Sequence, residues 1–169
     1  VWKRILLGAH LGARKEFVKS AKIFGTVIGH WHPHTEAIEG TAEILVHNGF
    51  LDGKGNWGSM FGQEPTGCAA PRYTSLKMNE FIEKIAFEFV DDVEWKEDEL
   101  DPEPTILPTM VPLCLFGKYE FNMIAFGFKT EIPNYKLSDL IMRLEYLLGK
   151  RSKVIIKPNI DGCKVNSSD

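Results

Sequence analysis

An arginine and a tyrosine stand side by side at Arg72 and Tyr73, and a tyrosine hydroxyl is one of the groups that can form a covalent intermediate. A phenol is a weak nucleophile near neutral pH. Such chemistry therefore needs a neighbouring cation or base and a metal ion, which promote loss of the proton and neutralise the group under attack. Arg72 supplies a fixed positive charge. The pair alone does not establish a function, because most tyrosines are packing residues whose hydroxyl is bonded at the surface.

Three histidines alternate at His30, His32 and His34, a spacing that can hold a metal ion. On a strand the three side chains would share one face, but Pro33 and the helical patterns on either side place them at a turn, with no cysteine close by. The second interpretation uses His32 and His34 as donors to a phosphate, with the positive N-terminus of a helix just after them. A zinc site is the less favoured of the two interpretations.

Residues 53–58 match the pattern G-x-G-x-x-G letter for letter. This pattern binds a dinucleotide where a strand precedes it and a helix follows it, because the helix N-terminus holds the pyrophosphate. Here the preceding segment has a helical pattern, and residues 59–62 open no helix. We therefore do not expect a nucleotide at this loop.

Apolar residues at helical spacing predict two helices, over residues 2–9 and 17–31, with a short turn between them. The second helix should end at the His-Pro sequence that follows it, since proline disfavours helix in the residue before it. A third helix is predicted to run from Thr35, as its N-cap, to Val46. These elements have the outline of a helix-turn-helix.

The rest of the chain predicts a mixture of loops, helices and strands. Residues 48–71 hold too many glycines and prolines for a helix and predict a structured loop. Helical spacing returns over residues 76–90, and residues 106–128 predict short strands broken by proline and glycine. Residues 137–148 predict a last amphipathic helix closed by a glycine, before a strand at residues 154–156.

Charge is segregated along the chain, although the net charge is only −3. Residues 1–34 carry six Lys or Arg against one acid, whereas residues 80–103 carry eleven Asp or Glu against two lysines. Phosphate is attracted to the first segment and repelled by the second, so a nucleic acid should lie along the N-terminal part, with the acidic stretch facing elsewhere. Two ordinary solvated faces would explain the same pattern equally well.

The composition, 44% hydrophobic and 25% charged over 169 residues, is that of a soluble globular protein with one large or two small domains. No apolar run approaches the roughly 20 residues needed to cross a bilayer, so no membrane partner is expected. Three widely spaced cysteines favour a reducing compartment. Because the sequence begins with Val1 and stops in a polar run, we expect a piece of a longer polypeptide.

Four separated motifs occur in a fixed order: KSAKIFGTVIG at residues 19–29, HPH at 32–34, LDGKGNWGS at 51–59 and AAPRYT at 69–74. Together they resemble the A subunit of bacterial DNA gyrase and topoisomerase IV, which are type IIA DNA topoisomerases. Residues 124–134 resemble the family segment that presses on DNA, and residues 157–162 resemble the start of its tower domain. The resemblance spans nearly the whole chain.

The resemblance implies an α/β (α+β) fold, with a winged-helix (helix-turn-helix) DNA-cleavage domain over residues 1–103 and the start of an α/β tower domain over residues 104–169. The family forms a homodimeric gate that cuts both strands of double-stranded DNA, passes a second duplex and reseals the cut. By that likeness Tyr73 attacks a phosphodiester and forms a transient 5′-phosphotyrosyl bond. The likeness further implies that Arg72, His34 and Arg4 stabilise the scissile phosphate. It also implies that the DNA backbone is held by Lys3, Lys19, Lys22 and His32, and that Ile124 is a wedge inserted between base pairs.

The resemblance places the cofactors elsewhere. Mg²⁺ and ATP are expected on a B-type subunit or region that carries the ATPase and the metal-binding module. Nothing in this chain resembles that module, and the acidic run 91–103 is a poor substitute, because its carboxylates crowd a connector rather than converging from separate elements. The expected location is the cytoplasm of a bacterial or phage-infected host cell.

Some positions depart from the family pattern. Thr35 follows the paired histidines where the family usually has glycine, and Lys22 replaces an arginine, which keeps the charge but loses the bidentate fork. Three extra residues lie in the loop before Arg72 and Tyr73. These departures suit a divergent, viral or phage member rather than a cellular gyrase.

A non-enzymatic helix-turn-helix DNA-binding protein is the alternative class of function. It would need base-reading side chains on the third helix, where residues 37–42 are mostly alanine, glycine, isoleucine and threonine. For Ile124, the alternative to a DNA wedge is a core residue of a strand. We expect the enzyme, and a covalent protein–DNA adduct is the property that separates the two classes.

Overall fold

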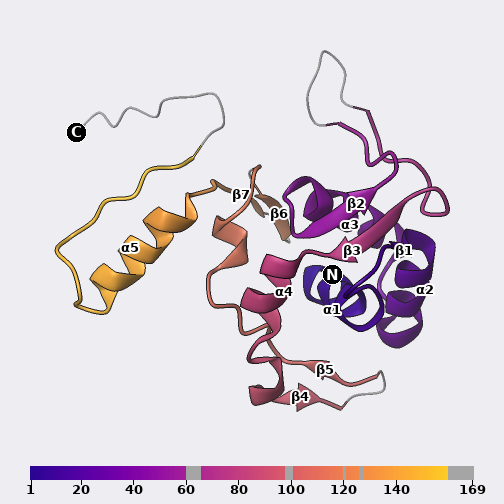
Figure 1. Cartoon of the computed structure of the whole chain (residues 1–169), viewed down its shortest axis with the longest axis horizontal. Helices are drawn as coiled ribbons and strands as arrows, with labels where there is room; N and C mark the ends of the chain where they lie inside the picture. The colour runs from indigo at the N-terminus through magenta and orange to yellow at the C-terminus, as the bar shows by residue number, and fades with distance from the viewer. Residues whose placement is uncertain (60–65, 98–100, 120, 126–127, 160–169) are drawn as a thin grey trace. The chain divides into compact units, whose positions relative to one another are not determined.

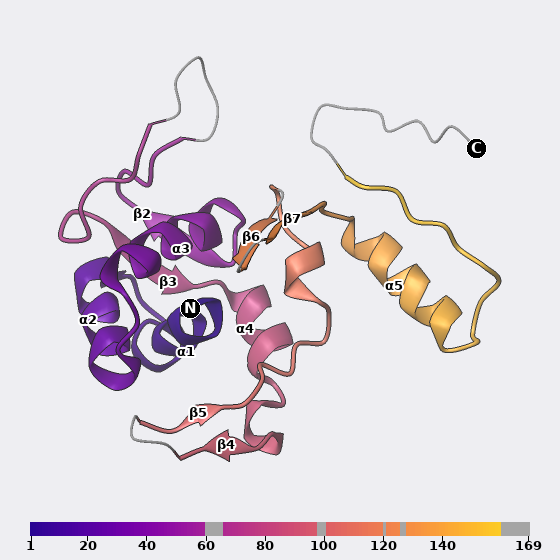
Figure 2. The same cartoon turned by 180° about the vertical axis from the view of Figure 1, so that it is seen from behind.

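The computed structural model describes residues 1–59, 66–97, 101–119, 121–125 and 128–159, of which residues 122–125 and 128 are described by their backbone alone. The chain divides into two compact units, Val1–Met110 and Val111–Asp169 (Figures 1 and 2). Among the described residues, no helix combines the length and the apolar character needed to cross a membrane.

The first unit is built around three helices, α1 (Trp2–Gly12), α2 (Ser20–Trp31) and α3 (Thr35–His47). Their apolar faces meet in a core of residues such as Ile5, Val27 and Ile38, each 0% exposed, which explains the helical spacing in the sequence. Gly8 allows α1 to approach α2 closely, because a Cβ there would lie 2.5 Å from Val27 Cγ2. The helices agree with the predicted ones to within a few residues at each end.

A small antiparallel sheet completes this core. Its strands, β1 (Val18–Lys19), β3 (Ser75–Met78) and β2 (Leu51–Lys54), are ordered β1-β3-β2, with Val18 opposite Leu76 and Leu51 opposite Met78. The predicted loop over residues 48–71 therefore contains a strand. Its glycine at position 53 hid the strand pattern, but the ladder to β3 and the burial of Leu51 stabilise it.

The predicted helix over residues 76–90 was wrong for its first four residues. Residues 75–78 form β3, where Leu76 and Met78 are buried and their neighbours face outward with the period of a strand. The helix α4 (Glu80–Phe87) begins only after Asn79, whose side chain accepts hydrogen bonds from the first backbone N–H groups of the helix. Likewise, the N-cap position of α3 is His34 rather than Thr35, and no side-chain cap bond forms there.

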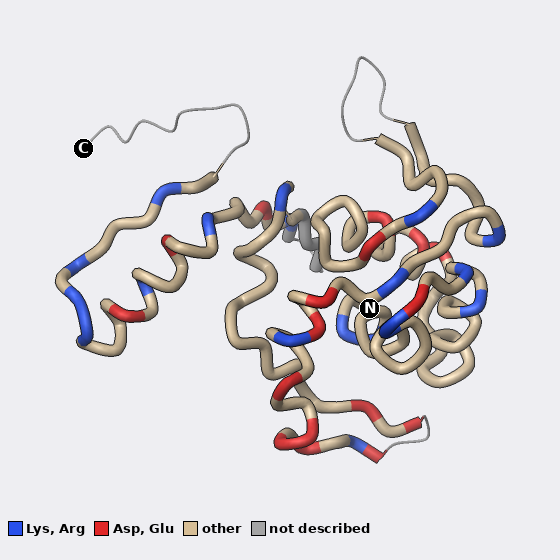
Figure 3. Tube along the Cα trace, in the orientation of Figure 1, with Lys and Arg blue, Asp and Glu red and all other residues tan. Residues whose placement is uncertain are grey.

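A short hairpin follows α4. The 3₁₀ turn η1 (Val90–Asp92) leads into β4 (Trp95–Lys96), which pairs antiparallel with β5 (Glu103–Pro104). Figure 3 shows acidic residues along this hairpin. It is the acidic stretch of the sequence, and its β5 end packs within the first unit.

The second unit contains η2 (Leu113–Leu115), the antiparallel pair β6 (Phe121–Ala125) and β7 (Phe128–Ile132), and the helix α5 (Leu137–Leu147). The last helix ends as predicted, before Gly149 with its positive φ of 73°. The predicted strand at residues 154–156 is wrong, because the structure leaves these residues outside any strand and Val154 O accepts from Arg143 Nη1 (2.9 Å). The end of the predicted segment 157–162 lies outside the described residues.

Candidate nucleic-acid interface

The turn that carries Tyr73 is attached to the N-terminal end of α2. Within the turn, Tyr73 N donates to Ala70 O (2.8 Å). The backbone N–H groups of Ser20 and Ala21 donate to Thr74 O and Pro71 O, each at 3.2 Å. The first N–H groups of a helix have no partner inside the helix, so the turn satisfies donors that α2 leaves free. The backbone on both sides of Tyr73 is thereby held.

A buried pair of hydroxyls fixes the same turn from behind. Thr74 Oγ1 donates to Ser20 Oγ at 2.9 Å, and the two residues are 1% and 0% exposed. Buried polar groups are costly unless they are bonded, so this pair favours one arrangement of the strand and the helix. Thr74 directly follows Tyr73, which places the tyrosine at a defined point of the surface.

Tyr73 itself is 62% exposed, which makes its ring accessible to a large ligand. The Arg72 guanidinium lies 4.8 Å from the centre of that ring, within the range of a cation–π contact. Lys19 and Lys22, both exposed, stand at the N-cap and in the first turn of α2. The structure thus brings four predicted site residues to one end of α2, where the helix dipole also favours an anion.

The three alternating histidines have different structural roles at the C-terminal end of α2. His32 is the left-handed C-cap of α2, with φ 45°, and its N–H donates to Ile28 O (2.9 Å). His34 is the N-cap of α3, and both side chains are exposed. His30 Nδ1 instead lies 2.6 Å from Asp101 Oδ2. In the described part of the chain, no three His, Cys, Asp or Glu side chains gather as a metal site.

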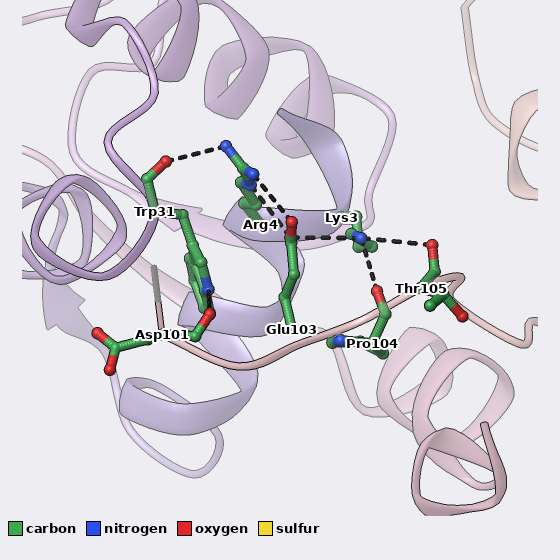
Figure 4. A network of polar contacts seen from close by, with 7 residues as sticks. All are labelled: Lys3, Arg4, Trp31, Asp101, Glu103, Pro104 and Thr105. Carbon is green, nitrogen blue, oxygen red and sulfur yellow. Dashed lines mark hydrogen bonds and ion pairs between the residues drawn. The ribbon is translucent and has the colours of Figure 1, made fainter. Parts of the chain in front are cut away.

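Arg4 and Lys3 are both engaged by Glu103 from β5, as Figure 4 shows. The Arg4 guanidinium donates to the carboxylate through Nε (3.1 Å) and Nη2 (2.9 Å), and through Nη1 to Trp31 O (2.9 Å). Lys3 Nζ donates to Pro104 O (2.6 Å) and lies 3.3 Å from Glu103 Oε2. We call Arg4, Lys3 and Glu103 the Glu103 clamp.

Hydrogen bonding within the Glu103 clamp shifts the pKa values of two of its members. The hydrogen bond from Arg4 lowers the pKa of Glu103 below its ordinary value of 4.5, and burial opposes that shift only in part. The same bond raises the pKa of Arg4. Both groups therefore stay charged throughout the physiological range.

The expectation that the acidic stretch faces away from the N-terminal cations was wrong for its last residues. Besides the Glu103 clamp, Asp101 pairs with His30, and its backbone oxygen accepts from Trp31 Nε1 at 3.1 Å. Unlike charges that are far apart in the sequence can neutralise each other in the fold, and the linear charge pattern cannot show this.

Within one chain, the predicted site residues of the first unit form two groups rather than one cluster. The Tyr73 turn is bonded to Ala21, whereas Arg4 is bonded to Trp31 O. At 1.5 Å per residue these two points of α2 are about 15 Å apart. Ile124 belongs to the second unit, where its backbone pairs with that of Lys129, and its side chain lies outside what the structure describes.

Sequence reasoning missed the residues that hold the two groups in place. Ser20 and Thr74 are 54 positions apart and Arg4 and Glu103 are 99 apart, so local spacing carried no signal for either pair. The predicted helix over residues 17–31 also began three residues before Ser20, the first residue of α2, so nothing in the sequence indicated that Ser20 stands at a helix end.

The glycine pattern at residues 53–58 serves packing. A Cβ at Gly53 would lie 2.6 Å from Val46 Cγ1, and one at Gly58, where φ is 77°, would clash with the carbonyl oxygen of Thr66. The predicted helix α3 does precede this segment, but the strand β2 follows it and includes the first two residues of the pattern. Ser59 then bridges to Thr66 instead of opening a helix. The structural context of a dinucleotide site is therefore missing here.

The exposed Tyr73, the cations beside it and the helices α2 and α3 agree with a protein that binds and cleaves DNA. Comparison with known families identifies the class. The model of the family described as the A subunit of DNA gyrase/topoisomerase IV matches residues 1–167, and the chain belongs to this family.

Individual relatives are similar over most of the chain. It is 37% identical to the DNA gyrase A subunit of Campylobacter jejuni over 153 residues, 82% of this chain and 17% of the relative. It is 35% identical to the DNA gyrase A subunit of Helicobacter pylori strain J99, over 88% of this chain and 19% of the relative. It is also 35% identical to the DNA gyrase A subunit of Mycoplasma genitalium, over 88% of this chain and 18% of the relative. The chain thus spans less than a fifth of the length of these relatives.

Proposed function

We propose that this chain is the breakage-reunion segment of an ATP-hydrolysing type II DNA topoisomerase and that Tyr73 is its nucleophile. The observation that carries the proposal is an exposed tyrosine, with Arg72 over its ring, on a turn held to α2 by backbone bonds and a buried hydroxyl pair. A preorganised nucleophile needs such a rigid support, because small displacements of a reacting group are costly. Membership in the gyrase A family supports the same interpretation.

The proposed reaction exchanges one phosphodiester for another. The Tyr73 oxygen attacks phosphorus and forms the P–O bond of a 5′-phosphotyrosyl link, while the P–O3′ bond breaks. The tyrosine hydroxyl gives up its proton, and the departing 3′ oxygen gains one. Resealing is the reverse step. Arg72 neutralises charge on the phosphate, and Lys19 and Lys22 hold the neighbouring backbone.

The described residues do not form a binding site for the metal ion that this reaction needs, since no three His, Cys, Asp or Glu side chains gather among them. We propose that Mg²⁺ and ATP bind to a B-type subunit or region. When bound, Mg²⁺ would help to stabilise the charge that develops on the oxygens. We also propose double-stranded DNA as substrate, a homodimer as the working assembly and, because the similar gyrases are bacterial, the cytoplasm as the location.

We interpret α1–α3 and the β1-β3-β2 sheet as a winged-helix domain in which α2 and α3 form the helix-turn-helix. The proposed tower begins near residue 104, close to the end of the first compact unit at Met110. Ile124 remains a proposed wedge between base pairs. Arg4 and His34 remain proposed contacts of the scissile phosphate. Since they belong to the opposite end of α2 from Tyr73, the second copy in a homodimer is a natural source of one of the two groups.

The exposed side of α3 gives little support to a protein that only reads DNA sequence. Its exposed positions include Glu36, Ala37, Glu39 and Gly40, which offer acids or no hydrogen-bonding side chain. Base reading in the major groove depends largely on Arg, Lys, Asn and Gln.

The test is Tyr73→Phe in the complete natural polypeptide that contains this sequence, assayed with its B-type partner, Mg²⁺ and duplex DNA. Only the nucleophilic oxygen is removed, so we expect loss of protein-linked DNA on a denaturing gel, with DNA affinity changed by less than about threefold. Tyr146→Phe is the matched control, because Arg143 lies over that ring at the same 4.8 Å. An adduct that persists in Tyr73→Phe would refute the assignment.

A further inference from the structure

The proposed chemistry leaves the Glu103 clamp unexplained, although its three charged side chains are linked by hydrogen bonds and ion pairs. A carboxylate from the acidic hairpin binds two cations of α1, Arg4 and Lys3, which the family likeness assigns to DNA. Both N–O contacts of Arg4 are short and side-on, the geometry in which a guanidinium holds a carboxylate most firmly.

The donors of Arg4 are only partly used. A guanidinium has five N–H groups, and the structure assigns one each from Nε, Nη2 and Nη1, to Glu103 and to Trp31 O. One N–H of Nη1 and one of Nη2 have no acceptor among the described residues, and the side chain is 27% exposed. Arg4 is therefore held at one edge and can still offer hydrogen bonds to a phosphate.

Lys3 differs from Arg4 in this respect. Its ammonium has three N–H donors, and three acceptors surround it: Pro104 O at 2.6 Å, Glu103 Oε2 at 3.3 Å and Thr105 O at 3.5 Å. Lys3 thus binds the hairpin to α1 and supports the Glu103 carboxylate from its far side. Figure 4 shows the carboxylate between the two cations.

We infer that Glu103 is a positioning residue for DNA cleavage, which acts by fixing the orientation of the Arg4 guanidinium toward a DNA phosphate. The inference rests on the proposed function. A side chain that served DNA attraction alone would be better without a carboxylate, because Glu103 reduces the charge of the cluster from two positive charges to one. The Glu103 carboxylate instead gives the planar Arg4 guanidinium a defined direction, and it weakens the attraction of the cluster for DNA.

Glu103→Gln in the complete polypeptide with its B-type partner tests this inference. The variant keeps the shape of the side chain but removes its charge and turns an N–H₂ group toward Arg4. We expect the single-turnover rate of adduct formation to fall roughly 10- to 100-fold. DNA affinity should stay equal or become tighter. A variant that had only lost stability would instead bind and cleave less well together.

Three controls separate positioning from other causes. Glu94→Gln removes the same charge from an exposed position next to β4 of the same hairpin, and it should cleave like the unmodified protein. Glu103→Asp, which keeps the charge with a shorter reach, should recover part of the rate. In an Arg4→Ala background, Glu103→Gln should cause no further loss, because the residue acts through Arg4.

An unchanged cleavage rate in Glu103→Gln overturns the inference, and so does an equal loss in the Arg4→Ala background. Either result leaves the proposed function intact as long as the unmodified protein forms the adduct through Tyr73. If the unmodified protein forms no adduct with partner, Mg²⁺ and DNA present, the proposed function fails and the positioning role falls with it.

Discussion

The two ends of α2 hold their functional side chains by different means. At the N-terminal end, the Tyr73 turn is fixed by backbone bonds and by the neutral, fully buried pair Ser20–Thr74. At the C-terminal end, Arg4 is fixed by a partly exposed ion pair with Glu103. Neutral buried bonds are insensitive to salt and pH, whereas ion pairs near the surface are screened and can be exchanged for other anions. The support of the proposed nucleophile should therefore be insensitive to salt, whereas the orientation of Arg4 depends on an ion pair that salt can weaken.

Removing the buried Ser20–Thr74 hydrogen bond should lower stability more than removing the Arg4–Glu103 ion pair. Ser20→Ala leaves the Thr74 hydroxyl buried without its acceptor, and we expect a loss of about 1–3 kcal/mol in the free energy of unfolding. The double variant Ser20→Ala with Thr74→Val removes both hydroxyls and should cost clearly less than the sum of the two single changes. Urea denaturation measures all of these. Additive losses would show that the pair is not a coupled unit.

Lys19 and Lys22 should contribute more than Lys3 to the salt dependence of DNA binding. Lys19 and Lys22 are exposed beside the Tyr73 turn, so replacing either by alanine should lower the slope of log affinity for DNA against log salt by up to about 0.9. Lys3→Ala should change the slope by less than half as much, because its donors are already used by the hairpin. Affinity titrations across a series of salt concentrations measure the slopes. A Lys3 slope change equal to that of Lys22 would contradict this ranking.

The smallest expected effect is on pH dependence. The pKa of Glu103 is lower in the folded state than its ordinary value of 4.5, so its contribution to stability is fully present above that value and is lost as pH falls through the folded pKa. The difference in unfolding free energy between the unmodified protein and Glu103→Gln should therefore stay constant from about pH 7 to 5 and shrink only in more acid solution. A difference that already shrinks between pH 7 and 5 would argue against the clamp.

Much of the first unit was predictable from local pattern. The spacing of apolar residues predicted α1, α2 and α3, because each helix has to bury one face against the others. The same reasoning took residues 76–78 for helix, although they belong to β3. Four residues of alternating burial are too short a signal beside a longer helical pattern, and their strand form depends on pairing with β1 and β2.

The sequence by itself determined the family, the helical core and the identity of the exposed Arg72-Tyr73 pair, since these depend on residue type and short spacing. Only the tertiary structure decided what surrounds the charged residues. Glu103 reaches Arg4 across 99 positions and Asp101 reaches His30 across 71. Long-range electrostatic pairs form because chain folding brings their elements together, and linear charge counts contain no information on that approach.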